Sequence, residues 1–197
     1  MNWSSYKESI SKLTKKQKGD SFEHLTKIYL LNNPKYKILL KNVWMLDEVP
    51  MKIHKHLNLP KRDEGIDIIC ETHEHEFWSV QAKYRTDEST SISHHDLETF
   101  GSLSFGHCKN IKYALVSTSA SKYAKLFSTY PDLGFITGDT WIKLDSEYFD
   151  LYQGSQSTLQ FDPYDPYPHQ EVAINKCLKH FKNKKESRGK LIMACGT

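Results

Sequence analysis

Two short stretches of this sequence carry polar residues at spacings suited to phosphodiester chemistry. Asp67 follows Gly65 by two residues, and Gln81 precedes Lys83 by two residues. Alternate side chains of a β-strand point to the same face, so Gln81 and Lys83 share a face if they lie on a strand. Hydrolysis of a phosphodiester requires a hard divalent cation held by oxygen atoms, an activated water and positive charge near the phosphate. Asp67 and Gln81 offer the oxygen atoms, and Lys83 offers the charge or orients the water.

A β-hairpin is expected to bring these residues together. Ile66–Glu71 and Phe77–Tyr84 are strand candidates, and the polar residues 72–76 between them suit a turn. Asp67 then lies near the start of the first strand, beside a glycine that permits close approach of the backbone. The carboxylate, the amide oxygen and the ammonium group can therefore converge on one place.

The elements around the hairpin alternate between strands and helices. Helices are expected over residues 19–32, around Met51–His56, and over His94–Leu103, Ser119–Phe127 and Trp141–Leu151. Further strands are expected over Tyr36–Leu40, Tyr113–Ser117 and Leu133–Ile136. This alternation predicts an α/β domain over residues 1–152, with a central mixed sheet flanked by helices.

The character of the chain changes after residue 152. Residues 153–165 are rich in Ser, Gln, Pro and Asp, which is typical of a linker. Residues 166–197 begin a second domain, in which His169–Lys182 is expected to form an amphipathic helix and Lys190–Cys195 a strand.

Composition excludes several classes of protein. With 38% hydrophobic residues, the 197-residue chain can build a packed core. No apolar run approaches the roughly 20 residues that a membrane helix needs. The four cysteines are far apart and read as free thiols. We therefore expect a protein of the reducing cytoplasm, without a membrane partner.

The charge is distributed unevenly along the chain. Residues 21–131 are nearly balanced, with 14 basic and 13 acidic side chains, although the formal net charge of the whole is +3. Contacts to nucleic-acid phosphates must therefore come from local patches. The candidates are Lys15, Lys16, Lys18 and Arg85.

The Gly65-x-Asp67 and Gln81-x-Lys83 motifs resemble the PD-(D/E)xK nucleases, in particular the Mrr-like branch with a Q-x-K half-motif. The segment Val116–Ser119 is similar to the third core strand of that family, and the resemblance covers roughly residues 15–150. It implies a restriction-endonuclease-like fold that cuts double-stranded DNA with Mg²⁺, for which Mn²⁺ can substitute. It also implies that the backbone carbonyl of Ala82 and an N-terminal helical glutamate, here Glu23, complete the metal site.

The tail resembles the start of a superfamily 2 helicase. Pro166–Gln170 looks like the element that reads adenine in that family, which gives Gln170 this role in the full-length protein. Ala194–Thr197 looks like the first half of a phosphate-binding loop, and the Gly-Lys-Thr that would complete it is absent from the sequence. A Mrr-like nuclease followed by a motor resembles type ISP restriction-modification enzymes, which implies a downstream methyltransferase as well. We accordingly expect this chain alone to lack ATPase activity and to cut DNA weakly and without sequence preference.

Each of these residues also has a structural interpretation. Asp67 could be a turn residue, Lys83 a solvated strand lysine, Gln81 a polar edge residue and Glu23 an exposed helical side chain. The rival function from another class is a non-catalytic DNA-binding or docking module attached to a helicase. Retention of Asp67, Gln81 and Lys83 together favours the nuclease, because a site that has lost its function usually loses one of its residues.

Overall fold

The structure is a computed structural model that describes residues 1–60, 65–154 and 167–180. The chain divides into two compact units, Met1–Leu159 and Gln160–Thr197. The first unit contains the sheet and the candidate site, and the described part of the second consists mainly of helix α8 (Pro168–Leu178).

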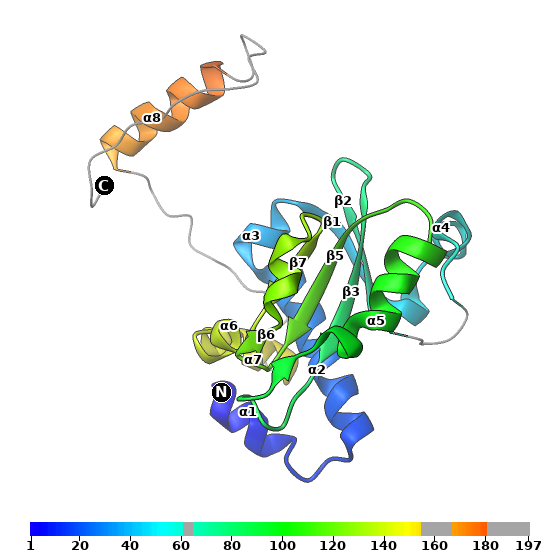
Figure 1. Ribbon diagram of the computed structural model, residues 1–197. Coiled ribbons are helices and arrows are strands. Elements are labelled where there is room, and N and C mark those ends of the chain that lie inside the picture. Colours follow the sequence, from blue (N-terminus) through cyan, green and yellow to red (C-terminus); the bar gives the residue numbers. More distant parts are fainter. Residues whose placement is uncertain (61–64, 155–166, 181–197) are drawn as a thin grey trace. The chain divides into compact units, whose positions relative to one another are not determined.

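Within the described residues, the first unit is built on a five-stranded sheet (Figure 1). Its strands, in spatial order, are β1 (Leu40–Met45), β2 (Ile68–Thr72), β3 (Phe77–Lys83), β5 (Ile111–Thr118) and β7 (Leu133–Ile136). β2 is antiparallel to both of its neighbours, β1 and β3, whereas β5 and β7 run parallel to β3. A separate parallel pair joins β4 (Ser91–Ile92) to β6 (Lys122–Tyr123).

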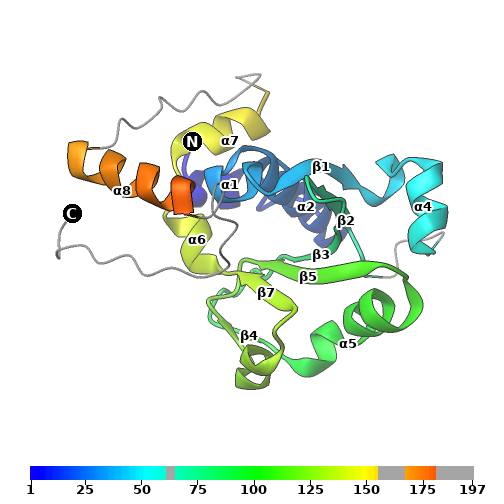
Figure 2. The same ribbon diagram turned by 90° about the horizontal axis from the view of Figure 1, so that it is seen from above.

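Helices cover both faces of this sheet, which gives three layers (Figure 2). One face carries α1 (Trp3–Ser9), α2 (Lys15–Asn32), α6 (Gly138–Ile142) and α7 (Ser146–Tyr152). The other carries α5 (His94–Ser102), its π-helical extension η2 (Leu103–His107) and the 3-10 helix η3 (Lys125–Thr129). Three short helices complete the unit: α3 (Pro34–Lys37), η1 (Leu46–Glu48) and α4 (Met51–Leu57).

Strand alternation divides the core between the two faces. On β5, Leu115 belongs to the cluster under α2, whereas Ala114 and Val116 belong to the cluster under α5. Phe22 of α2 and Phe100 of α5 are almost completely buried on opposite sides of the sheet. The expected α/β architecture, a mixed sheet flanked by helices, is therefore confirmed.

Several elements expected from the sequence match the structure closely. The β2–β3 hairpin, α4, α5 and β7 all form where they are predicted, and the helix expected from residue 19 starts earlier, at Lys15. Thr14 explains the earlier start, because its hydroxyl accepts a hydrogen bond from the N–H of Gln17 while the Gln17 side chain accepts one from the N–H of Thr14. The helix α1 is an element that the sequence analysis did not anticipate.

Three expected elements are wrong in type or extent. Tyr36 lies in α3, which Asn33 caps and Pro34 opens, so the strand starts only at Leu40. The helix expected over Ser119–Phe127 is replaced by β6 and η3. The helix expected over Trp141–Leu151 is interrupted, because α6 ends at Ile142 and α7 begins at Ser146.

The expectations for the C-terminal part are only partly visible. Helix α8 begins at Pro168, one residue before the predicted helix His169–Lys182, and overlaps it as far as Leu178. Most of the expected linker, the end of that helix and the strand Lys190–Cys195 lie outside the described residues. Among the described residues, no helix is long and apolar enough to cross a bilayer.

Candidate active site

Asp67 is fixed immediately before β2 by hydrogen bonds of its backbone and its carboxylate. Its N–H donates to the carbonyl of Val80 at 2.9 Å, and its carbonyl accepts from the N–H of Leu46 at 2.9 Å. The side chain is 8% exposed, and its Oδ2 accepts a hydrogen bond from the N–H of Ala82 at 2.6 Å. The carboxylate is therefore held against the backbone of β3, one residue from Gln81.

Gln81 is the most unusual polar residue of the site. The residue is only 4% exposed, and its buried Oε1 atom has no hydrogen-bond partner among the residues that the structure describes. A buried acceptor without a partner costs about 1–3 kcal/mol of stability. A residue of this kind calls for an explanation, and a bound cation is one.

Gly65 makes room for the Gln81 amide. Its φ of +118° lies in a region that favours glycine, and a Cβ atom added there would lie 3.2 Å from Nε2 of Gln81. The glycine in the Gly65-x-Asp67 motif thus permits both the chain direction and the close approach to Gln81.

Lys83 shares a hollow with Gln81, as the strand alternation predicts. The hollow measures about 440 Å³ and lies between the end of β3 and the helix α5. It is lined by Gly65, Gln81, Lys83, His95, Asp96, Glu98 and Thr99. The structure therefore brings Gln81 and Lys83 together directly, and it brings Asp67 to the backbone beside them.

Helix α5 supplies polar groups to this hollow that the sequence analysis missed. His95, Asp96, Glu98 and Thr99 all belong to its first two turns. A local signal was present, because Ser93 and Asp96 have the spacing of a capping box and so place Asp96 in the first turn. What the sequence could not show is which part of the sheet this turn faces.

Asp96 binds Arg85, which lies just beyond β3. Its Oδ1 accepts a hydrogen bond from the Arg85 guanidinium, and its Oδ2 accepts from the N–H and the hydroxyl of Ser93 at 2.9 and 2.7 Å. Burial raises the pKa of Asp96, but the hydrogen bonds from Ser93 and Arg85 outweigh it and bring the pKa from 3.8 to about 2. Arg85 is thus engaged in an ion pair, and its expected contact with DNA stays a prediction.

Glu23 lies on α2, at the face of the sheet opposite α5, and is half-buried. Its neighbour Phe22 packs on Tyr84 with ring centroids 5.7 Å apart, and Lys27, one turn further on, pairs with Glu48. Glu23 is not among the residues that line the hollow with Gln81 and Lys83. Its role as a metal ligand therefore stays a prediction.

The expected phosphate contacts lie at the start of α2. Lys15 and Lys16 are exposed and Lys18 is half-exposed. Cations are unfavourable at a helix N-terminus, so these lysines do not serve the stability of the helix. In the second unit, Gln170 lies in the first turn of α8, where its Oε1 accepts from the N–H of Tyr167 at 3.0 Å.

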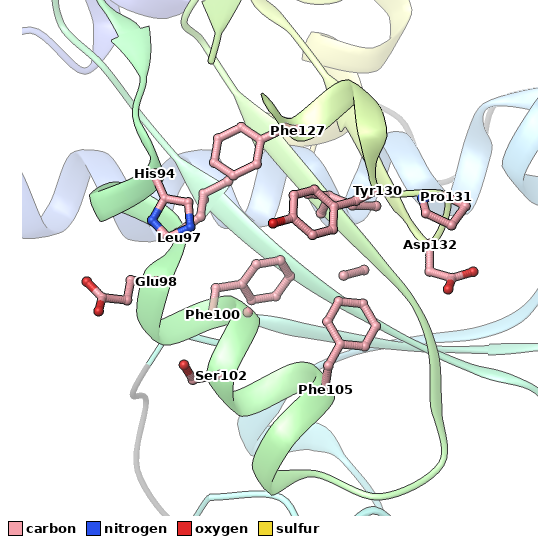
Figure 3. Close-up of a pocket in the computed structure, with 13 residues that line it drawn as sticks. His94, Leu97, Glu98, Phe100, Ser102, Phe105, Phe127, Tyr130, Pro131 and Asp132 are labelled. Carbon is pink, nitrogen blue, oxygen red and sulfur yellow. The ribbon is translucent and has the colours of Figure 1, made fainter. Parts of the chain in front are cut away.

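A larger hollow of about 620 Å³ lies on another side of α5 (Figure 3). Phe127 and Tyr130 line it opposite Phe100 and Phe105, and its polar groups include the carboxylates of Glu98 and Asp132. None of the residues that line it is a lysine or an arginine. It lacks the positive charge that a phosphodiester requires, so we assign the chemistry to the smaller hollow.

The residues at the smaller hollow fit a hard divalent cation. Gln81 lines the hollow and supplies a buried amide oxygen. Asp67 is not among the lining residues, but the N–H of Ala82 holds its carboxylate beside Gln81. Carboxylate and amide oxygens are ligand types that Mg²⁺ and Mn²⁺ accept. Among the residues that the structure describes, no three His, Cys, Asp or Glu side chains cluster as a metal site would require. A cation here would therefore depend on amide and backbone oxygens in addition to carboxylates.

Comparison with known families identifies the family of this chain. A family model of the Mrr catalytic type, described as restriction endonuclease, matches residues 31–129, which is half of the chain. The match includes Asp67, Gln81 and Lys83. The chain belongs to this restriction endonuclease family.

A solved structure is similar over nearly the whole chain. It is the ATP-dependent Type ISP restriction-modification enzyme LlaBIII bound to DNA, with a TM-score of 0.63 and 22% sequence identity. The match covers 98% of this chain and 12% of that one. At this identity the likeness establishes the fold, which is restriction-endonuclease-like. No curated protein matches the chain.

Proposed function

We propose that this chain is a metal-dependent endonuclease domain that hydrolyses phosphodiester bonds of double-stranded DNA. The observation that carries the proposal is the buried Oε1 of Gln81, which has no hydrogen-bond partner among the described residues. Gln81 lines a hollow with Lys83, and its neighbour Ala82 binds the Asp67 carboxylate. Membership of the restriction endonuclease family supports the same conclusion.

In this proposal, Asp67, Gln81 and the backbone carbonyl of Ala82 would hold Mg²⁺, or Mn²⁺ in its place, with Glu23 as a further candidate ligand. When bound, the cation supplies positive charge for the phosphorane that develops and favours deprotonation of the attacking water. Gln81 is neutral, so the ligand set carries less negative charge than one with a glutamate at this position.

Lys83 acts on the reacting groups from the same hollow. Its ammonium group orients the attacking water and stabilises the negative charge that develops on the phosphate oxygens. The lysines at the start of α2 (Lys15, Lys16 and Lys18) provide the contacts to phosphates outside the site.

We further propose that the full-length protein is a type ISP restriction-modification enzyme. The similar solved enzyme is ATP-dependent and bound to DNA, and the residues after 165 resemble the start of a helicase. Gln170 would then read the adenine of ATP, and helicase and methyltransferase domains would follow in the same polypeptide. Because the motor would hold DNA beside the nuclease domain, it would raise the effective concentration of substrate at Lys83.

The rival proposal is a docking module that kept the fold and lost catalysis. Such a module gains nothing from a buried Gln81 oxygen without a partner, which costs stability. Incubation of supercoiled plasmid with this chain, in Mg²⁺ or in EDTA, separates the two. We expect slow nicking or linearisation in Mg²⁺ only; DNA that stays supercoiled in Mg²⁺ while binding the chain would favour the docking module.

A further inference from the structure

Two buried hydroxyl groups hold the backbone of the segment that follows the site residues of β3. The Thr118 hydroxyl donates to the carbonyl of Lys83 at 2.8 Å. The Ser119 hydroxyl donates to the carbonyl of Arg85 at 3.0 Å and accepts from the N–H of Arg85 at 2.6 Å. The N–H of Ser119 also donates to the carbonyl of Lys83 at 3.4 Å. We call Thr118 and Ser119 the hydroxyl pair.

The hydroxyl pair is itself fixed from behind. Both side chains are completely buried, and the Thr118 hydroxyl accepts a further hydrogen bond from the N–H of Ala120 at 3.1 Å. The indole N–H of Trp141 donates to the Thr118 carbonyl at 3.0 Å. Gly138 approaches so closely that a Cβ atom there would lie 2.5 Å from the carbonyl oxygen of Ser119. The end of β5 is thus buried, hydrogen-bonded and closely packed.

The segment is also held from the side of α5. The Arg85 guanidinium pairs with Asp96, and Asp96 lines the same hollow as Lys83. Lys83 is the last residue of β3, where a strand would otherwise be prone to fray, and its ammonium group stands at the end of a flexible four-carbon stem. A well-defined position of that ammonium therefore depends on a fixed backbone at residues 83–85.

We infer that Thr118 and Ser119 are positioning residues for Lys83 in the cleavage reaction, an inference that rests on the proposed function. The hydroxyl pair fixes the backbone from which Lys83 extends, and it does so without touching the substrate. Positions of catalytic groups matter at this scale, because a displacement of about 1 Å can lower a rate about a hundredfold.

The test uses variants that separate the loss of a hydroxyl group from a change of side-chain shape. Thr118→Val removes the hydroxyl and keeps the shape, Thr118→Ser keeps the hydroxyl and loses a methyl group, and Ser119→Ala removes the second hydroxyl. The matched control is Ser104→Ala, which removes the hydrogen bond between the hydroxyl groups of Ser79 and Ser104. These two residues are equally buried, and Ser79 also lies on β3, but neither residue lines the hollow. All measurements are made well below the melting temperature of each variant.

Three readouts are compared in the 197-residue chain. Amide hydrogen exchange of Arg85 should accelerate in Ser119→Ala, and ¹³C relaxation at the Lys83 Cε should show greater mobility in Thr118→Val and Ser119→Ala. Single-turnover cleavage with Mg²⁺ should fall about tenfold to a hundredfold in these two variants, with DNA affinity within a factor of two. Thr118→Ser and Ser104→Ala should retain the mobility of Lys83 and the cleavage rate of the wild type.

If Thr118→Ser lost as much cleavage rate as Thr118→Val, the hydroxyl pair would have only a general structural role. A rate loss of the same size in Ser104→Ala would lead to the same conclusion. Unchanged Lys83 mobility in Thr118→Val and Ser119→Ala would overturn the inference whatever the cleavage rates. If the wild-type chain does not cut DNA with Mg²⁺, the proposed function fails instead, and the exchange and relaxation data still decide whether the hydroxyl pair positions Lys83.

Discussion

The N–H of Ala82 donates a hydrogen bond of 2.6 Å to Oδ2 of Asp67, so the carboxylate is attached to β3 beside Gln81. This contact joins the two half-motifs of the sequence, which are separated by a complete hairpin turn. It also shows why a backbone group next to Gln81 matters to the candidate site, because the position of the carboxylate depends on the conformation of β3.

Lys83→Ala should lower DNA cleavage about a hundredfold or more, because it removes the group proposed to orient the water and stabilise the phosphate charge. The fold should stay intact, because Lys83 is half-exposed and ends a strand. Plasmid cleavage with Mg²⁺ and circular dichroism measure the two effects. The matched control is Lys112→Ala, an exposed lysine at the opposite end of the β3–β5 ladder. Cleavage by Lys83→Ala at the rate of the wild type would remove Lys83 from the mechanism.

Metal affinity should depend on Asp67 and respond to the charge at position 81. Asp67→Ala should abolish the binding of Mn²⁺ in titration calorimetry, whereas Gln81→Glu should tighten it on the order of tenfold by adding a second carboxylate. Without metal, the buried new charge in Gln81→Glu should destabilise the fold, and Mn²⁺ should restore it. Binding that persists in Asp67→Ala would place the cation elsewhere.

Gly65→Ala should both destabilise the domain and impair cleavage. The positive φ opposes any side chain, at more than about 1 kcal/mol, and the added methyl group meets the Gln81 amide at 3.2 Å. Gly101→Ala is the matched control, because Gly101 lies inside α5 with nothing within 4 Å of an added Cβ, and it should stabilise by about 0.4–1 kcal/mol. Urea unfolding and plasmid cleavage give both quantities. A Gly65→Ala protein as stable and active as the wild type would refute the argument.

The pair of Asp96 with Arg85 should make stability depend on pH in the acid range. The pKa of Asp96 in the folded protein, about 2, lies below its ordinary value of 3.8. The charged form of Asp96 therefore stabilises the fold at pH values above 3.8. This contribution is lost as the pH falls from 3.8 towards 2. Asp96→Asn should be less stable than the wild type at neutral pH, and the difference in urea midpoint should shrink as the pH approaches 2. A difference that is constant from pH 7 to pH 2.5 would contradict this assignment.

The hairpin and its site residues could be predicted because their signals are local. Two strands and a polar turn are enough to bring Asp67 to β3 and to place Gln81 and Lys83 on one face. The helix expected at Ser119 was wrong because the Ser119 hydroxyl binds the backbone of Arg85, 34 positions away, instead of capping a helix. Helix α1 depends on a contact with a residue still further away in the sequence, since Trp3 stacks on Trp141 with ring centroids 6.2 Å apart. The position of α5 beside the hollow likewise involves the Arg85–Asp96 pair, and the spacing of residues along the sequence does not predict that pair.

DNA affinity should depend on the lysines at the start of α2 and on salt. Replacing Lys15, Lys16 and Lys18 by Gln should weaken binding to a duplex and reduce the slope of log affinity against log salt by about 2–3, since each phosphate contact contributes about 0.9. The matched control replaces Lys52, Lys55 and Lys112, which are also exposed, and lowers the formal net charge of +3 by the same three units. If net charge alone mattered, the two triple variants would lose the same amount of DNA affinity. If local contacts at α2 matter, only the variant without Lys15, Lys16 and Lys18 loses affinity. Fluorescence anisotropy with a duplex at several salt concentrations measures both slopes. Equal slopes for the two triple variants would show that the DNA does not bind at the start of α2.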